Sequence, residues 1–185
     1  MLNNKEWIKS KLSLLKLAQE ANDEGEIFKL IEDIAFYNII FSQQKPSWDK
    51  YFLNLAKIVS SRSIDPSTRH GCVIVDENKH VISIGYNGPV KGMDDSKIPM
   101  TRPLKYLYMS HSEQNGIMFC QSSMKNSTVY VTGRPCAFCT RMLIQKDVAR
   151  VAYGNITSKC VDAEDQKAAD DMIKQSKTVF EQIEF

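Results

Sequence analysis

The sequence predicts an α/β protein in which helices cover both faces of one mixed β-sheet, preceded by a helical extension. Helix-like and strand-like apolar spacings alternate from residue 48 onward, whereas two consecutive helical patterns fill the first 45 residues. The composition agrees with this class, because 43% hydrophobic and 25% charged residues in a chain of 185 suit an ordinary globular protein with one buried core.

The N-terminal part reads as an αα-hairpin. Residues 5–21 and 25–41 place apolar side chains at helical spacing, and the turn sequence NDEG separates them. The polar break SQQKP ends at Pro46, so we divide the chain into an extension of residues 1–45 and a domain of residues 46–185. The apolar stripes of the extension need burial, but the sequence leaves open whether it serves oligomerisation, covers a site or binds a partner.

The first half of the domain contains a helix and a β-hairpin. Residues 48–61 have the helical pattern, and the turn-forming sequence SIDPSTRHG follows them. GCVIVDENKHVISIGYNG then predicts two strands joined by a turn at residues 76–79. Residues 85–106 form a long irregular segment with three glycines and three prolines, and loops of this length in compact domains are usually functional or disordered.

The second half alternates helices and strands. Residues 111–121, 135–147 and 162–175 read as helices, and STVYVTG and VARVAYG read as the strands between them. This order predicts helices on both faces of the sheet. It also places helix N-termini and strand ends around a crevice, which suits a small-molecule site.

Charge and hydropathy exclude several classes of function. The net charge of +2 comes from 24 basic and 22 acidic residues spread through the chain, so we expect neither a nucleic acid nor a membrane surface as a partner. The longest apolar runs fall far short of the roughly 20 residues that a membrane span needs. The first twenty residues lack the continuous apolar stretch of a signal peptide, so we expect a cytoplasmic protein with reduced thiols. The five cysteines are Cys72, Cys120, Cys136, Cys139 and Cys160.

Two of these cysteines lie at the start of a predicted helix. The sequence PCAFC puts Pro135 at the first helical position and Cys136 and Cys139 on one side of the opening turn, where the helix dipole favours thiolates. A C-x-x-C pair alone is compatible with a redox pair, half of a zinc site or coincidence. Cys72 and Cys120 fall inside apolar patterns, and we interpret them as core thiols.

A histidine at another helix start favours the metal interpretation. His111 precedes Cys136 with one predicted strand between them, so His111, Cys136 and Cys139 can form three zinc ligands that leave a fourth position for water. Glu113 follows the histidine by two residues and has two interpretations. Ser110 and Glu113 form the S-x-x-E pattern of a helix capping box, or Glu113 is an acid/base group beside the metal.

The combination of HSE and PCAFC resembles the H-x-E…P-C-x-x-C signature of zinc-dependent nucleoside and nucleotide deaminases. Within that superfamily, the region from Trp48 to Tyr153 is similar to deoxycytidylate (dCMP) deaminases of phage and eukaryotic type. The similar stretches are WDKYF, DPSTRHGCVIV, GYNGPVKGMDD, VYVTGRPC and LIQKDVARVAYG. The signature favours Glu113 as the catalytic carboxylate, with which a cap can coexist.

The resemblance implies a three-layer α/β/α cytidine-deaminase-like fold and the conversion of dCMP to dUMP and ammonia, which supplies dUMP for dTTP synthesis. It implies that His111, Cys136 and Cys139 hold Zn²⁺ and that Glu113 moves protons between water and substrate. It also implies a homo-oligomer, often a hexamer, activated by dCTP and inhibited by dTTP at a site that includes the GYNG loop.

Residues for the substrate and the effector follow less directly. The resemblance suggests that Asn87 binds the sugar, although Asn-Gly also makes a tight turn, and Tyr153 either stacks on the base or belongs to the core. The proposed effector loop cradles phosphates through its backbone N–H groups, with a lysine as charge partner and an aspartate that orients the loop or an effector-bound Mg²⁺. The effector residues are Gly85, Tyr86, Gly88, Lys91 and Asp95.

Other polar residues stay unassigned or are expected at the surface. Arg102, Lys105 and Arg134 are candidates for the substrate 5′-phosphate, without an assignment to any one of them. His70 beside a strand start and His80 in a hairpin turn are interpreted as surface residues.

The chain departs from the usual dCMP deaminase pattern around the histidine. That family usually has Ala after the zinc histidine, then Leu-Asn-Ala after the glutamate, whereas this chain has Ser112 and then Gln114, Asn115 and Gly116. These changes limit what can be transferred about fine specificity and subunit contacts. Two rival functions are a related deaminase that acts on dCTP, free cytosine or tRNA adenosine, and a non-catalytic module with structural zinc, which predicts a fourth protein ligand.

Overall fold

The chain folds into two compact units, Met1–Lys45 and Pro46–Phe185. The computed structural model describes residues 4–41, 45–157 and 162–184. No helix in these ranges is long and apolar enough to cross a membrane.

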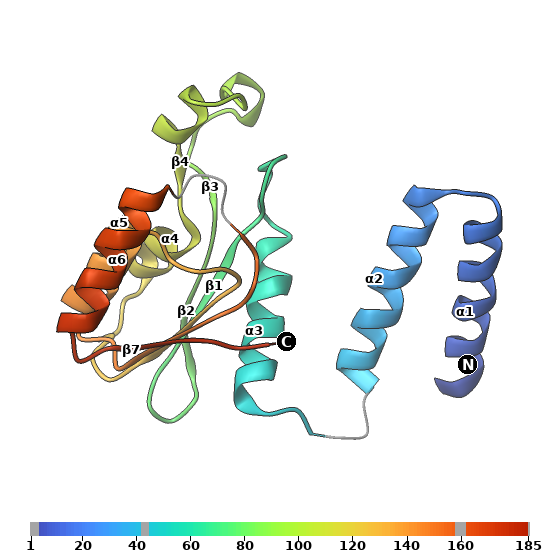
Figure 1. Ribbon diagram of the computed structural model, residues 1–185, viewed down its shortest axis with the longest axis horizontal. Coiled ribbons are helices and arrows are strands. Elements are labelled where there is room, and N and C mark those ends of the chain that lie inside the picture. The colour runs from blue at the N-terminus through green and yellow to red at the C-terminus, as the bar shows by residue number, and fades with distance from the viewer. Residues whose placement is uncertain (1–3, 42–44, 158–161, 185) are drawn as a thin grey trace. The chain divides into compact units, whose positions relative to one another are not determined.

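The smaller unit is a helical hairpin. Helix α1 (Asn4–Glu20) and helix α2 (Glu24–Phe41) run beside each other, as the apolar spacing predicted (Figure 1). Trp7 of α1 stacks on Tyr37 of α2 with ring centroids 4.0 Å apart. Asp23 begins the second helix by accepting a hydrogen bond from the Glu26 backbone N–H.

The larger unit is built on a five-stranded mixed sheet with the order β2-β1-β5-β6-β7. Strands β2, β1 and β5 pair antiparallel, and β5, β6 and β7 pair parallel. The strands are β1 (Gly71–Val75), β2 (Val81–Tyr86), β5 (Thr128–Val131), β6 (Arg150–Tyr153) and β7 (Val179–Gln182). The sequence patterns predicted the first four of these strands but missed β7.

Helices cover both faces of this sheet (Figure 1). They are α3 (Trp48–Ser60), α4 (Ser112–Phe119), α5 (Ala137–Gln145) and α6 (Ala163–Gln175). Helix α3 covers one face, α4 and α5 cover the other, and α6 packs against α5. The predicted three-layer α/β/α architecture is therefore confirmed.

Strand β1 shows why the central strands read as continuous apolar runs. Cys72 and Ile74 point into the core under α4 and α5, whereas Val73 and Val75 point into the core under α3. All four side chains are fully buried, because a central strand covered on both faces has no solvent side.

The long segment between β2 and α4 is irregular, as predicted, but contains short elements. Strand β3 (Gly88–Pro89) pairs with β4 (Met109–Ser110), and the 3₁₀ turns η1 (Asp95–Lys97) and η2 (Leu104–Leu107) lie between them. The short β3–β4 pairing brings the end of the segment back beside its beginning. The chain then enters α4 directly at His111.

Candidate active site

The N-termini of two helices meet at the site that the motif predicted. His111 is the N-cap residue of α4, and Cys136 is the N-cap residue of α5. Helix α5 therefore begins at Ala137, so the placement of Pro135 at the first helical position was wrong by two residues. Cys139 lies in the first turn, where the positive end of the helix dipole favours thiolates.

The cap of α4 differs from the predicted one. The His111 backbone N–H donates to Gln114 Oε1 at 2.8 Å, so Gln114 closes the helix end and the Ser110–Glu113 capping box was wrong by one residue. The reason is that the helix begins one residue later than expected, after His111. The Glu113 carboxylate does not cap the helix. It instead accepts a hydrogen bond from Ser112 Oγ at its Oε2 atom, at 2.8 Å.

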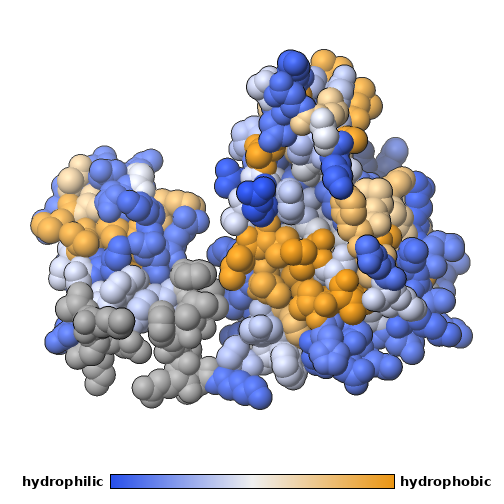
Figure 2. Space-filling model, turned by 180° about the vertical axis from the view of Figure 1, so that it is seen from behind, coloured by the Kyte–Doolittle hydropathy of each residue, from blue (hydrophilic) through white to orange (hydrophobic). Residues whose placement is uncertain are grey.

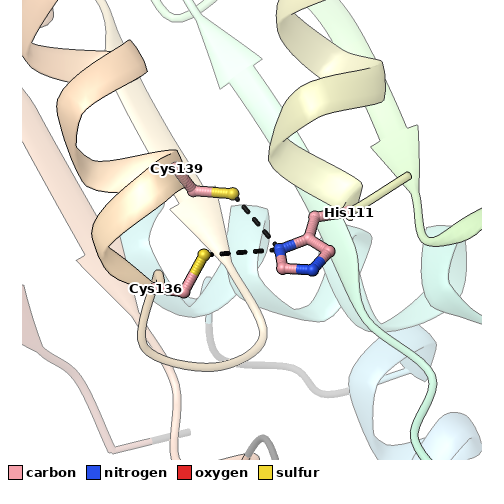
Figure 3. A group of neighbouring side chains, drawn as sticks. All are labelled: His111, Cys136 and Cys139. Atoms are coloured by element: carbon pink, nitrogen blue, oxygen red, sulfur yellow. Dashed lines mark hydrogen bonds between the residues drawn. The ribbon is translucent and has the colours of Figure 1, made fainter. Parts of the chain in front are cut away.

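The side chains of His111, Cys136 and Cys139 converge on one point (Figure 3). His111 Nδ1 lies 3.4 Å from the Sγ atom of each cysteine, and all three ligand atoms lie within 4.8 Å of one another. A tetrahedral zinc with bonds of about 2.1 Å to nitrogen and about 2.3 Å to sulfur separates such atoms by about 3.6 Å. The three residues fit a zinc ion, and no fourth residue in the described ranges joins the cluster.

Hydrogen bonds within the cluster shift its protonation. A hydrogen bond from Cys139 and another from His111 lower the pKa of the Cys136 thiol to about 4, against the effect of burial. The hydrogen bond between Cys139 and Cys136, together with burial, raises the pKa of the Cys139 thiol well above its usual value. The hydrogen bond with Cys136 also raises the pKa of His111. One thiolate is thus already present at neutral pH, and a bound metal ion deprotonates coordinating thiols outright.

Glu113 lies in a cavity beside the cluster. Its side chain belongs to the first turn of α4 and is 5% exposed. Residues from five segments line the cavity: Asp65, Thr68, His70, Asn87, Arg102, Lys105, Tyr106, Met109, Ser110, His111, Ser112, Glu113, Gly133, Arg134 and Cys136. The arrangement places a carboxylate and two of the three metal-type ligands on one wall of a single concave site.

A second wall of the cavity contains a buried ion pair that sequence reasoning missed. Lys105 Nζ donates to both carboxylate oxygens of Asp65 at 2.9 Å and to Ser67 Oγ at 3.2 Å. These contacts use the three N–H groups of the ammonium, so Lys105 is committed to the protein. Burial raises the pKa of Asp65, but the hydrogen bond from Lys105 and those from two backbone N–H groups outweigh it and lower the pKa.

Asn87 extends this network. Its Nδ2 donates to Asp65 Oδ2 at 3.3 Å and to the Thr68 carbonyl oxygen at 3.0 Å, and its Oδ1 accepts from the His70 backbone N–H at 2.7 Å. Asn87 does line the cavity, but most of its hydrogen-bonding capacity holds the loop before β1 in place. No local pattern links residues 65, 87 and 105, so only the folded chain reveals this network.

The two histidines expected at the surface behave differently. His80 is exposed in the hairpin turn, where its Nδ1 lies 3.2 Å from Asp76 Oδ2, and the prediction for it is confirmed. The prediction for His70 was wrong: its ring is largely buried and lines the cavity. The cause is a tertiary contact, because its Nδ1 lies 3.2 Å from Thr132 Oγ1 at the end of β5.

The remaining substrate candidates divide between two places. Arg102 and Arg134 both line the cavity, and Arg134 pairs with Asp170 at 2.5 Å. Tyr153 does not reach the cavity. It packs against the core and lines a separate depression with Gly154 and Asn155, and its stacking role stays a prediction.

The predicted effector residues gather around a different groove. It lies beside strand β2 and is lined by all five of them, Gly85, Tyr86, Gly88, Lys91 and Asp95. Gly85 also packs tightly on α4, since a Cβ there would lie 2.2 Å from the Ser112 carbonyl oxygen.

One face of the larger unit carries a region of hydrophobic side chains (Figure 2). Exposed hydrophobic residues that line the groove are Ile64, Ile84, Val90, Met93, Met118 and Phe119.

The other cysteines are not part of the cluster. Cys72 is fully buried in the core, which confirms its interpretation as a core thiol. Cys120 is partly buried against the same core, and its Sγ lies 3.4 Å from the Ser122 carbonyl oxygen. Cys160 lies outside the described residues.

Comparisons with known proteins agree with this geometry. Residues 46–155 match the model of a family described as the cytidine and deoxycytidylate deaminase zinc-binding region. A probable deoxycytidylate deaminase of Caenorhabditis elegans is 42% identical over 107 residues, which cover 55% of this chain and 54% of that protein. The deoxycytidylate deaminase of Mus musculus is 34% identical over 129 residues, or 66% of this chain and 71% of that protein.

A solved structure shows the same fold. The dCMP deaminase from the cyanophage S-TIM5, in its apo form, superposes with a TM-score of 0.59 at 24% sequence identity. The superposition covers 76% of this chain and all of the phage protein.

Proposed function

This chain belongs to the cytidine and deoxycytidylate deaminase family, and we propose that it is a zinc-dependent enzyme that converts dCMP to dUMP and ammonia. One observation carries the proposal: three ligand atoms spaced for one tetrahedral metal lie at the edge of a cavity that also contains Glu113. The names of the relatives support dCMP as the substrate.

In this proposal His111, Cys136 and Cys139 hold the zinc ion. When bound by these three residues, the ion would leave a position for water and would supply the activated nucleophile for C4 of the cytosine ring. The two thiolates neutralise the charge of the ion. To bind the ion, both thiols have to be deprotonated and must not be paired as a disulfide.

Glu113 moves the protons. It accepts one proton from the attacking water and delivers it to N3 of the ring, which makes C4 electrophilic. It then moves the proton of the new C4 hydroxyl to the amino group, which leaves as ammonia while the C4–N bond breaks and the C4 carbonyl of dUMP forms. Ser112 Oγ, which donates to Glu113 Oε2 at 2.8 Å, holds the carboxylate during these transfers.

The cavity also offers groups for the rest of the nucleotide. Lys105 is already paired with Asp65, so we assign the 5′-phosphate to the other two cavity-lining cations, Arg102 and Arg134, of which Arg134 also pairs with Asp170. Asn87 Oδ1 keeps one lone pair for a sugar hydroxyl, since it accepts a single hydrogen bond from the protein.

The groove beside β2 is proposed as the effector site. It contains the five residues of the loop that the family resemblance linked to dCTP and dTTP, including Lys91 for phosphate and Asp95 for an effector-bound Mg²⁺. Its exposed hydrophobic rim also suits contact with further copies of this chain, as in a homo-oligomer such as a hexamer.

The test is deamination of dCMP by the zinc-loaded protein, followed by the loss of cytosine absorbance in the ultraviolet. Glu113→Gln is expected to bind zinc at the wild-type level and to lose at least about 10³-fold in kcat, because a glutamine cannot accept or donate the protons. Glu77→Gln makes the same change in the exposed hairpin turn and serves as the matched control with wild-type activity.

Further arms of this experiment separate the rival functions. Added dCTP, with and without Mg²⁺, is expected to raise the activity, and dTTP to lower it. Full zinc content with no turnover of dCMP under any of these conditions contradicts the assigned substrate. Turnover of dCTP, cytosine or tRNA adenosine would then identify a related deaminase, and no turnover of any of them favours a structural zinc.

A further inference from the structure

His70 has an unusual place in the cavity. Its ring lines the cavity together with Glu113, but the family motif assigns it no role. The Nε2 atom is buried and has no hydrogen-bond partner among the described residues. A buried polar atom without a partner is unfavourable, so a ligand that supplies a hydrogen-bond partner gains binding free energy there.

The hydrogen bonds of Thr132 fix the tautomer of this ring. Thr132 Oγ1 is buried and accepts from the Gly71 backbone N–H at 3.1 Å. Its own hydroxyl proton needs an acceptor, and we assign His70 Nδ1, 3.2 Å away, as that acceptor. Nδ1 therefore carries no proton, and Nε2 carries one and is a hydrogen-bond donor.

The ring also stays uncharged. Burial lowers the pKa of His70, whereas Glu113 and Asp65 act in the opposite direction without cancelling the shift. The donor at Nε2 is thus a neutral N–H group, unlike the guanidinium groups of Arg102 and Arg134 in the same cavity.

The chain makes room for the imidazole at one glycine. A Cβ atom on Gly133 would lie 2.9 Å from His70 Cε1 and 2.1 Å from the Ile156 carbonyl oxygen. Any larger residue at position 133 would push the ring or the neighbouring backbone away. Thr132 and Gly133 together therefore hold the His70 ring in one orientation.

We propose that His70 is a substrate-contacting residue whose Nε2–H donates a hydrogen bond to the C2 carbonyl oxygen of the bound pyrimidine. The proposal rests on the proposed deaminase function. In that reaction Glu113 has to reach N3, and the C2 carbonyl oxygen is bonded to the ring carbon next to N3. The carbonyl oxygen therefore lies on the edge of the base that faces Glu113, and His70 lines the same cavity as Glu113. A neutral donor matches a neutral carbonyl oxygen, whereas the phosphate is matched by the two arginines.

Steady-state kinetics of three variants test this contact. His70→Leu removes the donor and is expected to lower kcat/KM for dCMP by about 10- to 100-fold, with unchanged zinc content. His70→Gln retains an amide N–H at a position similar to Nε2 and is expected to stay within about fivefold of wild type. The matched control is His80→Leu, the same substitution at the exposed histidine, with wild-type activity expected.

A substrate analogue distinguishes the base carbonyl from the sugar and phosphate oxygens. In 2-thio-dCMP sulfur, a weaker acceptor, replaces the C2 oxygen. His70→Leu should therefore lose much less activity with the analogue than with dCMP. An equal loss on both substrates, or a loss of less than twofold on dCMP, would overturn the assignment.

Nuclear magnetic resonance supplies a readout that does not depend on turnover. The chain has three histidines, so ¹⁵N-histidine labelling gives few signals, and His70→Leu identifies the one of interest. The Nε2–H tautomer is expected in the free zinc protein, with a downfield shift of this proton when dUMP is added. A shift with dUMP in a protein that does not deaminate dCMP would refute the proposed function and keep the His70 contact, whereas an Nδ1–H tautomer would refute the contact alone.

Discussion

The two walls of the cavity are built in opposite ways. The wall that carries His111, Cys136 and Cys139 comes from the first turns of two helices, and its residues belong to short local motifs. The second wall is held by Asp65 and Lys105, which lie 40 positions apart in the chain, Asp65 in the loop before β1 and Lys105 in the 3₁₀ turn η2. The residues of the reactive wall can therefore be recognised from short motifs, although His111 and Cys136 are 25 positions apart, whereas those of the second wall cannot.

The walls also balance their charges differently. The cluster of one imidazole and two thiols needs a cation to hold both sulfurs as thiolates. The buried Asp65–Lys105 pair is complete without any ligand, since each charge is hydrogen-bonded to the other. Removing one residue of the cluster should therefore cause loss of the metal, whereas removing one residue of the ion pair in the second wall should destabilise the fold.

The largest effect is expected from the reactive wall. His111→Ala removes one of three ligands, so we expect zinc content to fall to a small fraction of one per chain and dCMP deamination to fall at least about 10⁴-fold. Metal analysis of the purified protein beside the activity assay measures both. Cys120→Ala, which changes a thiol outside the cluster, should keep its zinc, and equal zinc loss in both variants would contradict the ligand assignment.

Substitutions in the second wall should change the stability of the protein. Lys105→Met leaves the Asp65 carboxylate buried without its partner, and we expect the free energy of unfolding to fall by about 3–5 kcal/mol in urea titrations. Lys97→Met removes an exposed lysine that pairs with Asp94 and should change it by less than about 1 kcal/mol. If the two variants are equally stable, the buried pair does not hold this wall.

A smaller effect, in the pH dependence of stability, sharpens the same comparison. The pKa of Asp65 in the folded chain is lower than its ordinary value of 3.8, so the folded state favours the carboxylate. Its stabilisation is fully present above the unfolded pKa and is lost as the pH falls through the lower folded value. The difference in unfolding free energy between wild type and Asp65→Asn should be constant above about pH 5 and shrink below about pH 4. If the difference in unfolding free energy instead grew on acidification, the pKa of Asp65 in the folded chain would be higher than its ordinary value, which would contradict this prediction.

Several interpretations from the sequence failed for reasons of distance along the chain. His70 reads as a surface residue because nothing near it in sequence shows that Thr132 and Gly133 enclose its ring from 62 positions away. Lys105 reads as a phosphate candidate because its partner Asp65 lies in another loop. Strand β7 was missed because an edge strand that is partly exposed lacks a continuous apolar run.

The sequence by itself determined the helical hairpin, four strands of the mixed sheet, the layers around it and the metal-type cluster. These features depend on periodicity, helix capping and spacing within a turn, which act over a few residues. The tertiary structure alone decided where His70 points, that Lys105 is occupied by Asp65, and that Tyr153 lies away from the cavity. The physical reason is that burial and hydrogen bonding of a polar side chain depend on partners that only folding brings near.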